Sequence, residues 1–388
     1  MIPVNQMQSD APGQEPFLSR IGGDFLRVVA MLAVLAIHAT GRWESVFRQE
    51  HDFFSQAFLA VLLNQLARFS VPLFVLLSGY ALARRYHAAW SGDSGNGVIH
   101  DTLVFYRRRL WKIGVPFLVW TLVILALTGR FRPPVDTDAW VGNLQTLMPY
   151  LLWRGADYHF YFFIIILQMY LLFPFIFRMT RAASLRTKTI GLILLFGWQL
   201  LWTYPSVEIF RALGWPRPTF PTAFFIYWVF YFYAGVYCAL LRPAGERASA
   251  SGAIWIPVVL AVSFGVMLAE YIMRSYSDPV PGYYNHFSRW SVVVFSMLVF
   301  ALLVAWDGRL QSIASTRPRA AGVLGRASAL TFAVYLYHTW ILRGIQATPV
   351  AGELFSTIVV LAVLSFGLAY LLDRLVKPGW IRTVLGLP

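Results

Sequence analysis

The stretch Asp24-Phe-Leu-Arg27-Val-Val-Ala-Met-Leu-Ala-Val-Leu-Ala-Ile-His38 places ionisable side chains at the two ends of an apolar run. An α-helix turns by about 100° per residue, so the eleven-residue step from Arg27 to His38 makes about three full turns. Both side chains therefore face the same side of the helix, about 16 Å apart along its axis. An arginine near one membrane surface would then be aligned with a histidine near the middle of the bilayer.

The composition excludes a soluble globular protein. Of the 388 residues, 58% are hydrophobic and 13% are charged, which is too apolar for a single water-facing domain. The net charge of +14 comes from arginines between apolar segments, a pattern that favours anionic lipids and phosphate-bearing substrates and not nucleic acid. A single cysteine, Cys238, excludes a disulfide framework. The sequence therefore predicts an all-α, polytopic integral membrane protein.

Apolar runs near the length of about twenty residues that crosses a bilayer occur ten times along the chain. They cover residues 25–41, 53–84, 111–128, 159–178, 188–204, 222–241, 253–273, 288–306, 327–345 and 352–373. The second run is long and contains Pro72, which predicts either one kinked helix or two half-helices.

The distribution of positive charge predicts the orientation. The tails and even-numbered loops hold twenty Lys and Arg residues and the odd-numbered loops hold ten, which puts both termini in the cytoplasm. The first twenty residues lack the pattern of a cleaved signal peptide, so the first helix is expected to direct its own insertion. We expect a cytoplasmic tail over 1–20, one transmembrane domain over 21–376 and a cytoplasmic tail over 377–388. The outer loops 129–158, 205–221 and 274–287 are rich in aromatic residues, which fits either an interfacial belt or a sugar-stacking surface.

Several segments together resemble one family, the acyltransferase 3 family of membrane O-acyltransferases. The matching segments are Arg20 to His38, Ser70 to Tyr80, Phe105 to Pro116, His159 to Pro174 and Tyr335-Leu-Tyr-His338. Two segments depart from the family pattern. Arg109-x-x-Lys112 stands where the family has two arginines, and Ile166-Leu-Gln168 stands where the O-antigen branch has Glu-Glu-Gln. The second departure makes the chain similar to the smaller branch without a fused extracytoplasmic domain.

The resemblance implies a bacterial enzyme of the cytoplasmic (inner) membrane that uses acyl-CoA, expected to be acetyl-CoA, as its co-substrate. The acceptor would be a hydroxyl group of an extracytoplasmic polysaccharide or of a polyisoprenoid-linked saccharide. The CoA phosphates would bind the basic residues Arg84, Arg85, Arg107, Arg108, Arg109 and Lys112. The alternative for these six residues is a purely topological role, because positive charge gathers on the cytoplasmic side of most membrane proteins.

His38 would then act as the general base on the acceptor hydroxyl or as the nucleophile that carries the acyl group. Arg27 and Asp24, three residues apart on one helix face, complete the predicted catalytic group. The alternatives are a His38 that only bonds a neighbouring helix and an Arg27 that pairs with Asp24 or reaches lipid phosphate.

A second group of polar residues inside the apolar runs is predicted to bind substrate. Asn64 and Arg68 are four residues apart on one face of the second run, and Arg68 needs a partner at that depth. Asp24, Asp373 or helix-end carbonyls are its candidate structural partners, and an oxyanion or phosphate is its candidate ligand. The remaining candidates are Gln168, His159, Tyr170 and His338. The seven histidines show no His-x-x-x-His spacing, so no metal site is predicted.

A transporter or flippase of a lipid-linked glycan is the alternative function, because it also needs many spans and intramembrane ionisable residues. Such a protein is expected to show paired broken helices in two related halves, and Pro72 is the one mid-span break in the sequence. A non-enzymatic assembly factor would leave the buried ionisable residues unexplained.

Overall fold

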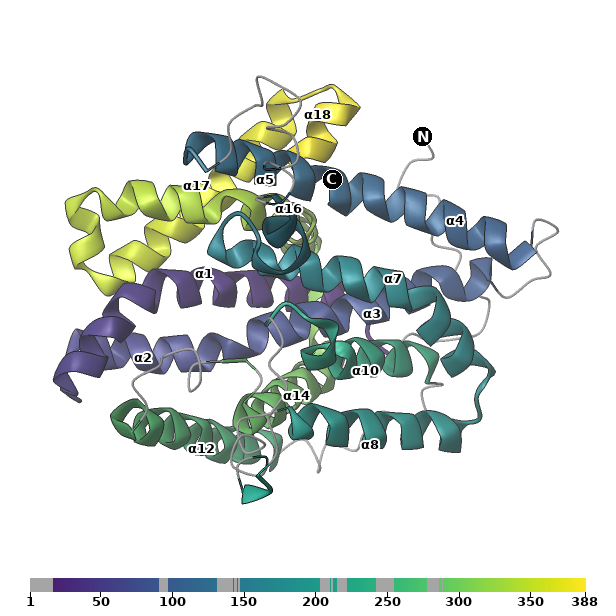
Figure 1. The fold of residues 1–388 in the computed structure, drawn as a ribbon, viewed down its shortest axis with the longest axis horizontal. Coiled ribbons are helices and arrows are strands. Elements are labelled where there is room, and N and C mark those ends of the chain that lie inside the picture. Colours follow the sequence, from purple (N-terminus) through teal and green to yellow (C-terminus); the bar gives the residue numbers. More distant parts are fainter. Residues whose placement is uncertain are drawn as a thin grey trace.

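The computed structural model describes residues 17–90, 97–130, 142, 145, 147–202, 210, 212–214, 222–241, 255–277, 286–287 and 289–388. Most of the aromatic outer loops and of the N-terminal tail over 1–20 lie outside these residues. Every element within them is a helix, and η marks short 3₁₀ or π segments (Figure 1). In chain order the elements are α1 (Arg20–Glu50), α2 (Gln56–Leu66), η2 (Ala67–Phe69), α3 (Ser70–Ala89), α4 (Gly97–Arg109), η3 (Leu110–Gly114), α5 (Val115–Leu127), η4 (Tyr150–Arg154), η5 (Tyr158–Phe160), α7 (Tyr161–Ala182), α8 (Leu185–Leu201), η6 (Phe225–Tyr227), α10 (Val229–Leu240), α12 (Trp255–Ser277), α14 (Trp290–Ala305), α15 (Asp307–Thr316), α16 (Pro318–Gln346), η7 (Pro349–Gly352), α17 (Leu354–Leu375) and α18 (Gly379–Val384).

The helices confirm an all-α polytopic membrane protein. Seven segments of the described chain are long and apolar enough to cross a bilayer, and the bent pair α14 and α15 makes an eighth if it counts as one span. The helices α8 and α10 coincide with two further predicted runs but have only 17 and 12 residues. A total of ten spans, with both termini in the cytoplasm, stays a prediction.

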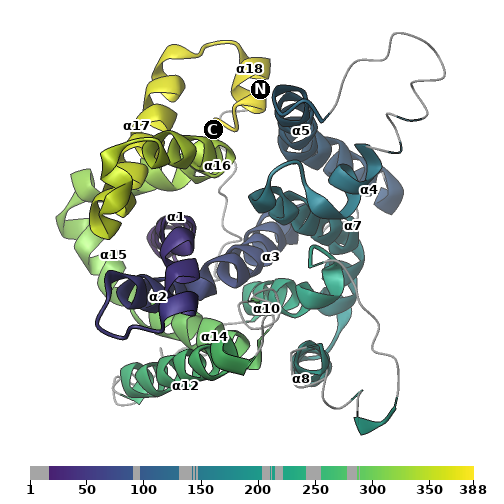
Figure 2. The ribbon, with the colours of Figure 1, turned by 60° about the vertical axis from the view of Figure 1, so that its left-hand side comes forward.

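Helix α1 lies inside the bundle, surrounded by α2, α3, α16 and α17 (Figure 2). Its residues Leu26, Ala30, Met31 and Leu35 are fully buried. The outer helices show the opposite pattern, because apolar side chains such as Val363 on α17 stay exposed at 64%. Apolar residues on the outer surface of a helical bundle are expected where lipid is the solvent. One face of the first apolar run therefore packs against other helices, whereas Leu32 on another face is 44% exposed.

The second apolar run forms one span with a local tightening in its middle. The span covers Gln56–His87, and α2 passes into α3 through the 3₁₀ turn η2. Pro72 has no N–H to donate to the carbonyl of Arg68, so the α-helical hydrogen-bond pattern is interrupted there. The amide of Ser70 instead donates to the carbonyl of Ala67. The prediction of a single interrupted helix is confirmed over that of two half-helices, and the interruption falls at Arg68.

Helices α3 and α10 pack with their backbones in contact. A Cβ atom on Gly79 would overlap the carbonyl of Phe232, and one on Gly235 would overlap the carbonyl of Leu76. Small residues permit this close approach in membrane helices. The neighbouring Ser78 donates its hydroxyl to the carbonyl of Phe74 in the same helix, at 2.8 Å.

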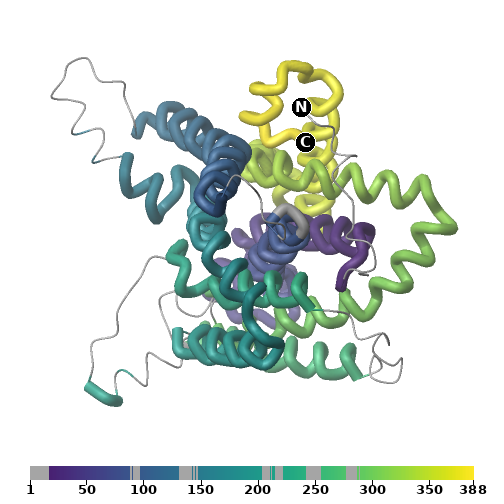
Figure 3. The backbone as a smooth tube through the Cα atoms, turned by 90° about the vertical axis from the view of Figure 1, so that its right-hand side faces the viewer, coloured from purple at the N-terminus to yellow at the C-terminus, as the bar shows by residue number. Residues whose placement is uncertain are grey.

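The C-terminal residues fold back on the bundle (Figure 3). Trp120 of α5 donates its indole N–H to the carbonyl of Val384 at 2.9 Å, and Leu387 is 6% exposed. Gly386, with a φ of 66°, lies against Phe332 of α16. The segment that we expected as a C-terminal tail is therefore docked between α5 and α16.

Candidate active site

Three histidines from distant parts of the chain meet inside the bundle. The ring centroid of His338 on α16 lies 5.0 Å from that of His38 on α1 and 5.0 Å from that of His159 in η5. The rings of His38 and His159 are 6.4 Å apart. His159 and His338 are buried, whereas His38 is partly exposed. The structure thus brings together three of the predicted site residues, which we name the histidine cluster.

The two buried histidines are held by Tyr335 and by backbone groups. The Nδ1 atom of His338 lies 2.8 Å from the carbonyl oxygen of Tyr335, one turn earlier on α16. Because a carbonyl only accepts, Nδ1 carries the proton, and Nε2 of His338 is left as an acceptor. That Nε2 atom is buried and has no partner among the described residues. The hydroxyl of Tyr335 in turn donates to the backbone carbonyl of His159, which fixes η5 against α16.

A cavity of about 400 Å³ opens beside His38. Helix α1, the α2–η2 segment, Tyr158 and α16 form its walls, so three of the predicted residues, His38, Asn64 and Arg68, face one space. The full lining is Ile37, His38, Gly41, Arg42, Glu44, Asn64, Arg68, Tyr158, Thr339, Leu342, Arg343 and Gln346. No sequence pattern predicted a role in the site for the lining residues Arg42, Glu44, Tyr158, Thr339 and Arg343.

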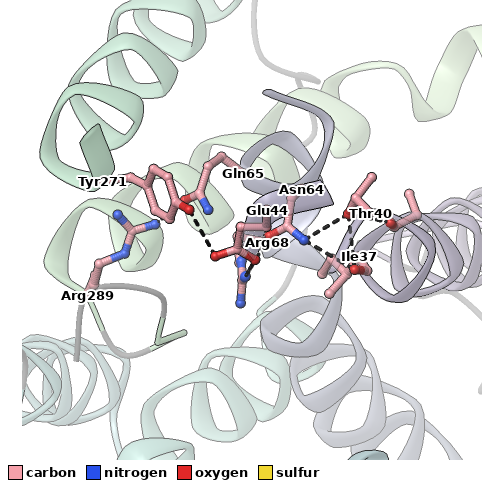
Figure 4. Close-up of polar contacts among 9 residues, drawn as sticks. Ile37, Thr40, Glu44, Asn64, Gln65, Arg68, Tyr271 and Arg289 are labelled. Carbon is pink, nitrogen blue, oxygen red and sulfur yellow. Dashed lines mark hydrogen bonds and ion pairs between the residues drawn. The ribbon is translucent and has the colours of Figure 1, made fainter. Parts of the chain in front are cut away.

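Arg68 is held at the cavity wall by a buried polar network (Figure 4). It donates to the Asn64 side-chain oxygen at 2.6 Å and lies 3.9 Å from the carboxylate of Glu44. The amide of Asn64 donates to Thr40 at 2.8 Å, so α1 and the α2–η2 segment are joined beside His38. The partners of Arg68 thus include Asn64, Glu44 and the ring of Phe287, at 5.0 Å from the guanidinium, and neither Asp24 nor Asp373 is among its described contacts.

The network continues away from the cavity towards α12 and α14. The hydroxyl of Tyr271 donates to Glu44 at 2.9 Å. Arg289, which is 1% exposed, donates to the side chain of Gln65 and, at 3.2 Å, to the carbonyl of Met267. A buried charge is costly unless it is paired and hydrogen-bonded, and these contacts supply that pairing. The position of Arg68 is therefore fixed from two sides.

A second ion pair forms the opposite wall. Arg343 of α16 donates to the carboxylate of Asp157 at 2.7 Å, and Thr339 lies 3.4 Å from the same oxygen. Asp157 also caps η5 by accepting from the amide of Tyr158 at 2.8 Å. This carboxylate lies 3.9 Å from His159. Asp157 therefore couples the placement of His159 to α16.

The other predicted catalytic residues lie at the N-terminal end of α1. Arg27 donates to Asp24 at 3.1 Å, and Asp24 also accepts from Ser328 of α16 at 2.7 Å. The guanidinium of Arg27 is 38% exposed, so the pairing with Asp24 leaves it accessible. Because α1 runs without a break from Arg20 to Glu50, Arg27 and His38 are on one face, about 16 Å apart along the axis.

Some of the predicted CoA-binding basic residues interact with Lys112, which also interacts with Arg27. The charge on Lys112 interacts electrostatically with those of Arg109, Arg85 and Arg27. Arg109 also lies over the ring of Tyr170, with its guanidinium 5.5 Å from the centroid. We name Arg27, Arg85, Arg109 and Lys112 the cationic group. The other predicted basic residues are not in it: Arg107 and Arg108 are exposed on α4, and Arg84 interacts with Tyr80 and His87.

A second cavity, of about 680 Å³, lies at this same end of α1. Arg20, Asp24 and Arg326 are among its lining residues, together with glycines and alanines of α15 and α16. Since Asp24 pairs with Arg27, this cavity lies next to the cationic group.

Two predicted substrate-binding residues lie away from the histidine cluster. Gln168 uses both ends of its amide on backbone groups, donating to the carbonyl of Ala223 at 2.8 Å and accepting from the amide of Phe225 at 3.0 Å. It therefore joins α7 to the segment before α10. Tyr170 lies beside Arg109, at the cationic group. Within the described part of the chain, no set of His, Cys, Asp and Glu side chains is arranged as metal ligands.

Comparison with known protein families gives one match. The model of the acyltransferase domain matches residues 21–374, nearly the whole chain. Neither the curated proteins nor the solved structures gave a match. The matched region contains the histidine cluster, the cavity and the cationic group. The chain belongs to the acyltransferase 3 family and is a multi-pass membrane acyltransferase.

Proposed function

We propose that the protein transfers an acyl group, expected to be acetyl, from acyl-CoA to a hydroxyl group of a glycan at the cavity beside His38. The acceptor would be an extracytoplasmic polysaccharide or a polyisoprenoid-linked saccharide, and the membrane would be the bacterial cytoplasmic membrane. The observation that carries this proposal is the arrangement on α1, where the cationic group at Arg27 and the cavity at His38 are joined by one straight helix face. The pantetheine arm of CoA is long and thin and is comparable in length with that separation.

The cationic group would bind the donor. CoA is polyanionic, and arginine side chains bind phosphate through paired N–H groups. Lys112 interacts electrostatically with Arg27, Arg85 and Arg109, and the four residues come from three separate segments: α1, α3 and the junction of α4 with η3. Topology alone does not require such convergence. We therefore assign them to the CoA phosphates, with Arg107, Arg108 and Arg84 in outer positions.

His38 would act on the acceptor hydroxyl. As a general base it takes the hydroxyl proton while the oxygen attacks the thioester carbonyl; the resulting oxyanion collapses, the C–S bond breaks, and the thiolate recovers the proton from His38. As a nucleophile, His38 would instead attack the thioester first; the C–S bond breaks, and the departing thiolate takes the ring proton and leaves as CoA thiol. The acceptor hydroxyl would then displace the acyl group from the ring nitrogen, and its proton would pass to the leaving imidazole. Arg68 would stabilise the oxyanion in either route, and its position in the lining of the same cavity supports this role.

His338 would position His38 and would not itself bind the acceptor. Its ring is fully buried and does not line the cavity, but it lies 5.0 Å from the ring of His38. With Nδ1 committed to Tyr335, the free Nε2 lone pair is the group that His38 can use as a hydrogen-bond acceptor. Such a bond would fix the tautomer of His38 and leave its other nitrogen for the chemistry, as the third member of a catalytic triad does.

The test is an acetyl-transfer assay with purified protein in detergent, radiolabelled acetyl-CoA and a panel of candidate glycans. We expect His38→Ala to lower transfer by at least 100-fold, the range that removal of a general base or nucleophile produces. His100→Ala is the matched control, because His100 is exposed on α4. Equal transfer by wild type and His38→Ala would refute the mechanism.

The same experiment distinguishes the two roles of His38 and the transporter alternative. Acid quenching before acceptor is added would recover labelled protein if His38 carries the acyl group, and unlabelled protein if His38 is a base. Reconstituted vesicles that move unmodified glycan without any acetyl transfer would establish a transporter.

A further inference from the structure

The cavity beside His38 has an excess of positive charge. Three of its lining residues are arginines, Arg42, Arg68 and Arg343, and only Glu44 is acidic. These arginines come from α1, from η2 and from α16, so the cations face one another across the cavity. The cavity volume of about 400 Å³ is that of a small-molecule binding site.

Two of the three arginines already have a carboxylate. Arg68 lies 3.9 Å from Glu44, and Arg343 lies 2.7 Å from Asp157. No carboxylate within the described ranges lies within ion-pair distance of Arg42, whose recorded contact is with the ring of the adjacent Trp43, at 5.8 Å. Arg42 therefore contributes the surplus charge to the cavity.

The position of Arg42 relative to His38 sets where this charge acts. Arg42 follows His38 by four residues, so it lies on the same helix face, about 6 Å further from Arg27. Gly41 beside it has open space where a Cβ would stand. The side chain of Arg343 is 43% exposed, so it also reaches the cavity while paired with Asp157. A ligand bound at His38 would extend past Gly41 to Arg42.

Acyl-CoA is expected to enter from the side of Arg27. The part of the cavity on the other side of His38, which includes Arg42, would therefore bind the acceptor. We propose that the acceptor is an anionic glycan, whose carboxylate or phosphate lies about one sugar ring from the acylated hydroxyl and pairs with Arg42. Arg343 provides a second contact for the same anion. This inference rests on the proposed function and adds to it the charge of the substrate.

Arginine suits this role because its planar guanidinium pairs with carboxylate or phosphate through two parallel hydrogen bonds. Arg42 is exposed although it lines the cavity, so an anionic group can reach its guanidinium from solvent. The two sources of the anion are a uronic acid residue and the diphosphate of a lipid-linked saccharide. Both present the same chemistry to Arg42.

The experiment compares three acceptors with acetyl-CoA as the donor throughout. They are a uronic-acid oligosaccharide, the same oligosaccharide with its carboxyl groups reduced to alcohols, and a neutral oligosaccharide on a polyisoprenyl diphosphate. The proteins are wild type, Arg42→Gln, Arg42→Lys and, as a control, Arg309→Gln, which removes an exposed arginine of α15. Acceptor KM and kcat are measured for each pair in neutral-lipid nanodiscs.

We expect wild type to prefer one of the two anionic acceptors over the neutral one by about 10- to 100-fold in kcat/KM, the range for one charge-assisted hydrogen-bonded pair. Arg42→Gln should abolish this preference by raising acceptor KM while leaving transfer to the neutral acceptor and the KM for acetyl-CoA unchanged. Arg42→Lys should retain part of the preference, and Arg309→Gln all of it. Preference for the uronic acid would identify a carboxylate, and preference for the diphosphate a phosphate.

Transfer to the neutral acceptor as efficient as to both anionic acceptors would overturn the inference and leave the proposed function intact. Equal losses by Arg42→Gln with all three acceptors would also overturn it, because Arg42 would then serve the fold or a lipid headgroup. Absence of transfer by wild type to any acceptor would contradict the proposed function as well.

Discussion

His338 differs from the other two histidines of the cluster because one of its ring nitrogens is committed to the backbone. The bond from Nδ1 to the carbonyl of Tyr335 fixes both the tautomer and the ring orientation. The buried Nε2 atom, without a described partner, would be costly in a residue that only fills space. Its distance from His38 gives that cost a functional explanation.

We predict that His338→Ala lowers kcat by about 10- to 100-fold, the usual effect of removing a group that orients a reacting side chain, without changing the KM for acetyl-CoA. His338→Gln should recover part of the activity, because its side-chain oxygen can accept a hydrogen bond. The pH profile of kcat/KM should also move, because His38 would lose the proposed hydrogen-bond partner that sets its tautomer.

The control for this prediction is Tyr337→Phe, which alters the neighbouring residue of α16 at a hydroxyl that bonds Leu385 at 3.4 Å. It should leave the pH profile in place. An unchanged pH profile in His338→Ala, with activity lost only in proportion to folded protein, would show that His338 is structural.

Site residues could be predicted from the sequence where a polar or ionisable residue interrupts an apolar helix. His38, Asn64 and Arg68 were predicted on that basis, and all three line the cavity. Arg42 and Glu44 lie just beyond the predicted apolar run 25–41, where charged residues are common because the membrane surface is near. The direction of their side chains could not be inferred, because the continuation of α1 to Glu50 was not predicted. Asp157 and Arg343 meet across 186 positions of sequence, and only the packing of η5 on α16 joins them.

The contact between α3 and α10 determines how the second span is held. Because η2 interrupts the hydrogen-bond pattern at Arg68, the span needs external support, and α10 packs directly on its following half. The two glycines at this contact leave no room for side chains. Arg68 should therefore keep its place only while α3 and α10 remain in contact.

We predict that Gly79→Ala destabilises the protein by about 2 kcal/mol, because its Cβ would overlap the Phe232 carbonyl and force the helices apart. Thermal unfolding in detergent measures this, with a thiol-reactive dye reporting exposure of Cys238, the only cysteine in the sequence and a buried one. Gly265→Ala is the control, because nothing lies within 4 Å of its added Cβ and alanine favours helix over glycine. An equal midpoint for the two variants would contradict the close contact.

Apolar length was enough to predict the positions of the long helices, but it did not predict the short docked segments. The ten apolar runs all coincide with helices, since apolar length is a strong signal in membrane proteins. The docking of α18 could not be predicted from the sequence, because its six residues are too few to show a periodic apolar pattern. The bridging role of Gln168 depends on the path of the chain before α10, which spacing alone does not reveal.

The distribution of Lys and Arg predicts the orientation of the whole molecule in the membrane, and labelling can measure it directly. In a Cys238→Ser background, we predict that Phe54→Cys is labelled by an impermeant maleimide in intact cells, because residue 54 is fully exposed at the turn between α1 and α2. His100→Cys, at the opposite end of the bundle on α4, should react only after the cells are opened. This result would put the cationic group on the side where acyl-CoA is available.

The reverse labelling pattern would place both termini outside the cytoplasm and remove the cationic group from the CoA pool. Labelling of both positions in intact cells would show that the preparation leaks, which a cytoplasmic marker enzyme detects. The count of ten spans can be tested in the same background by moving the cysteine through successive loops.

The packing of α1 against α16 and α17 has a consequence for how the enzyme is synthesised. Helix α1 is synthesised well before its neighbours α16 and α17. His338 is synthesised three hundred residues after His38. The imidazole of His38 is therefore in the nascent chain without this neighbour until α16 has been inserted. We expect products that are truncated before α16 to remain inactive, because they lack His338 and Arg343.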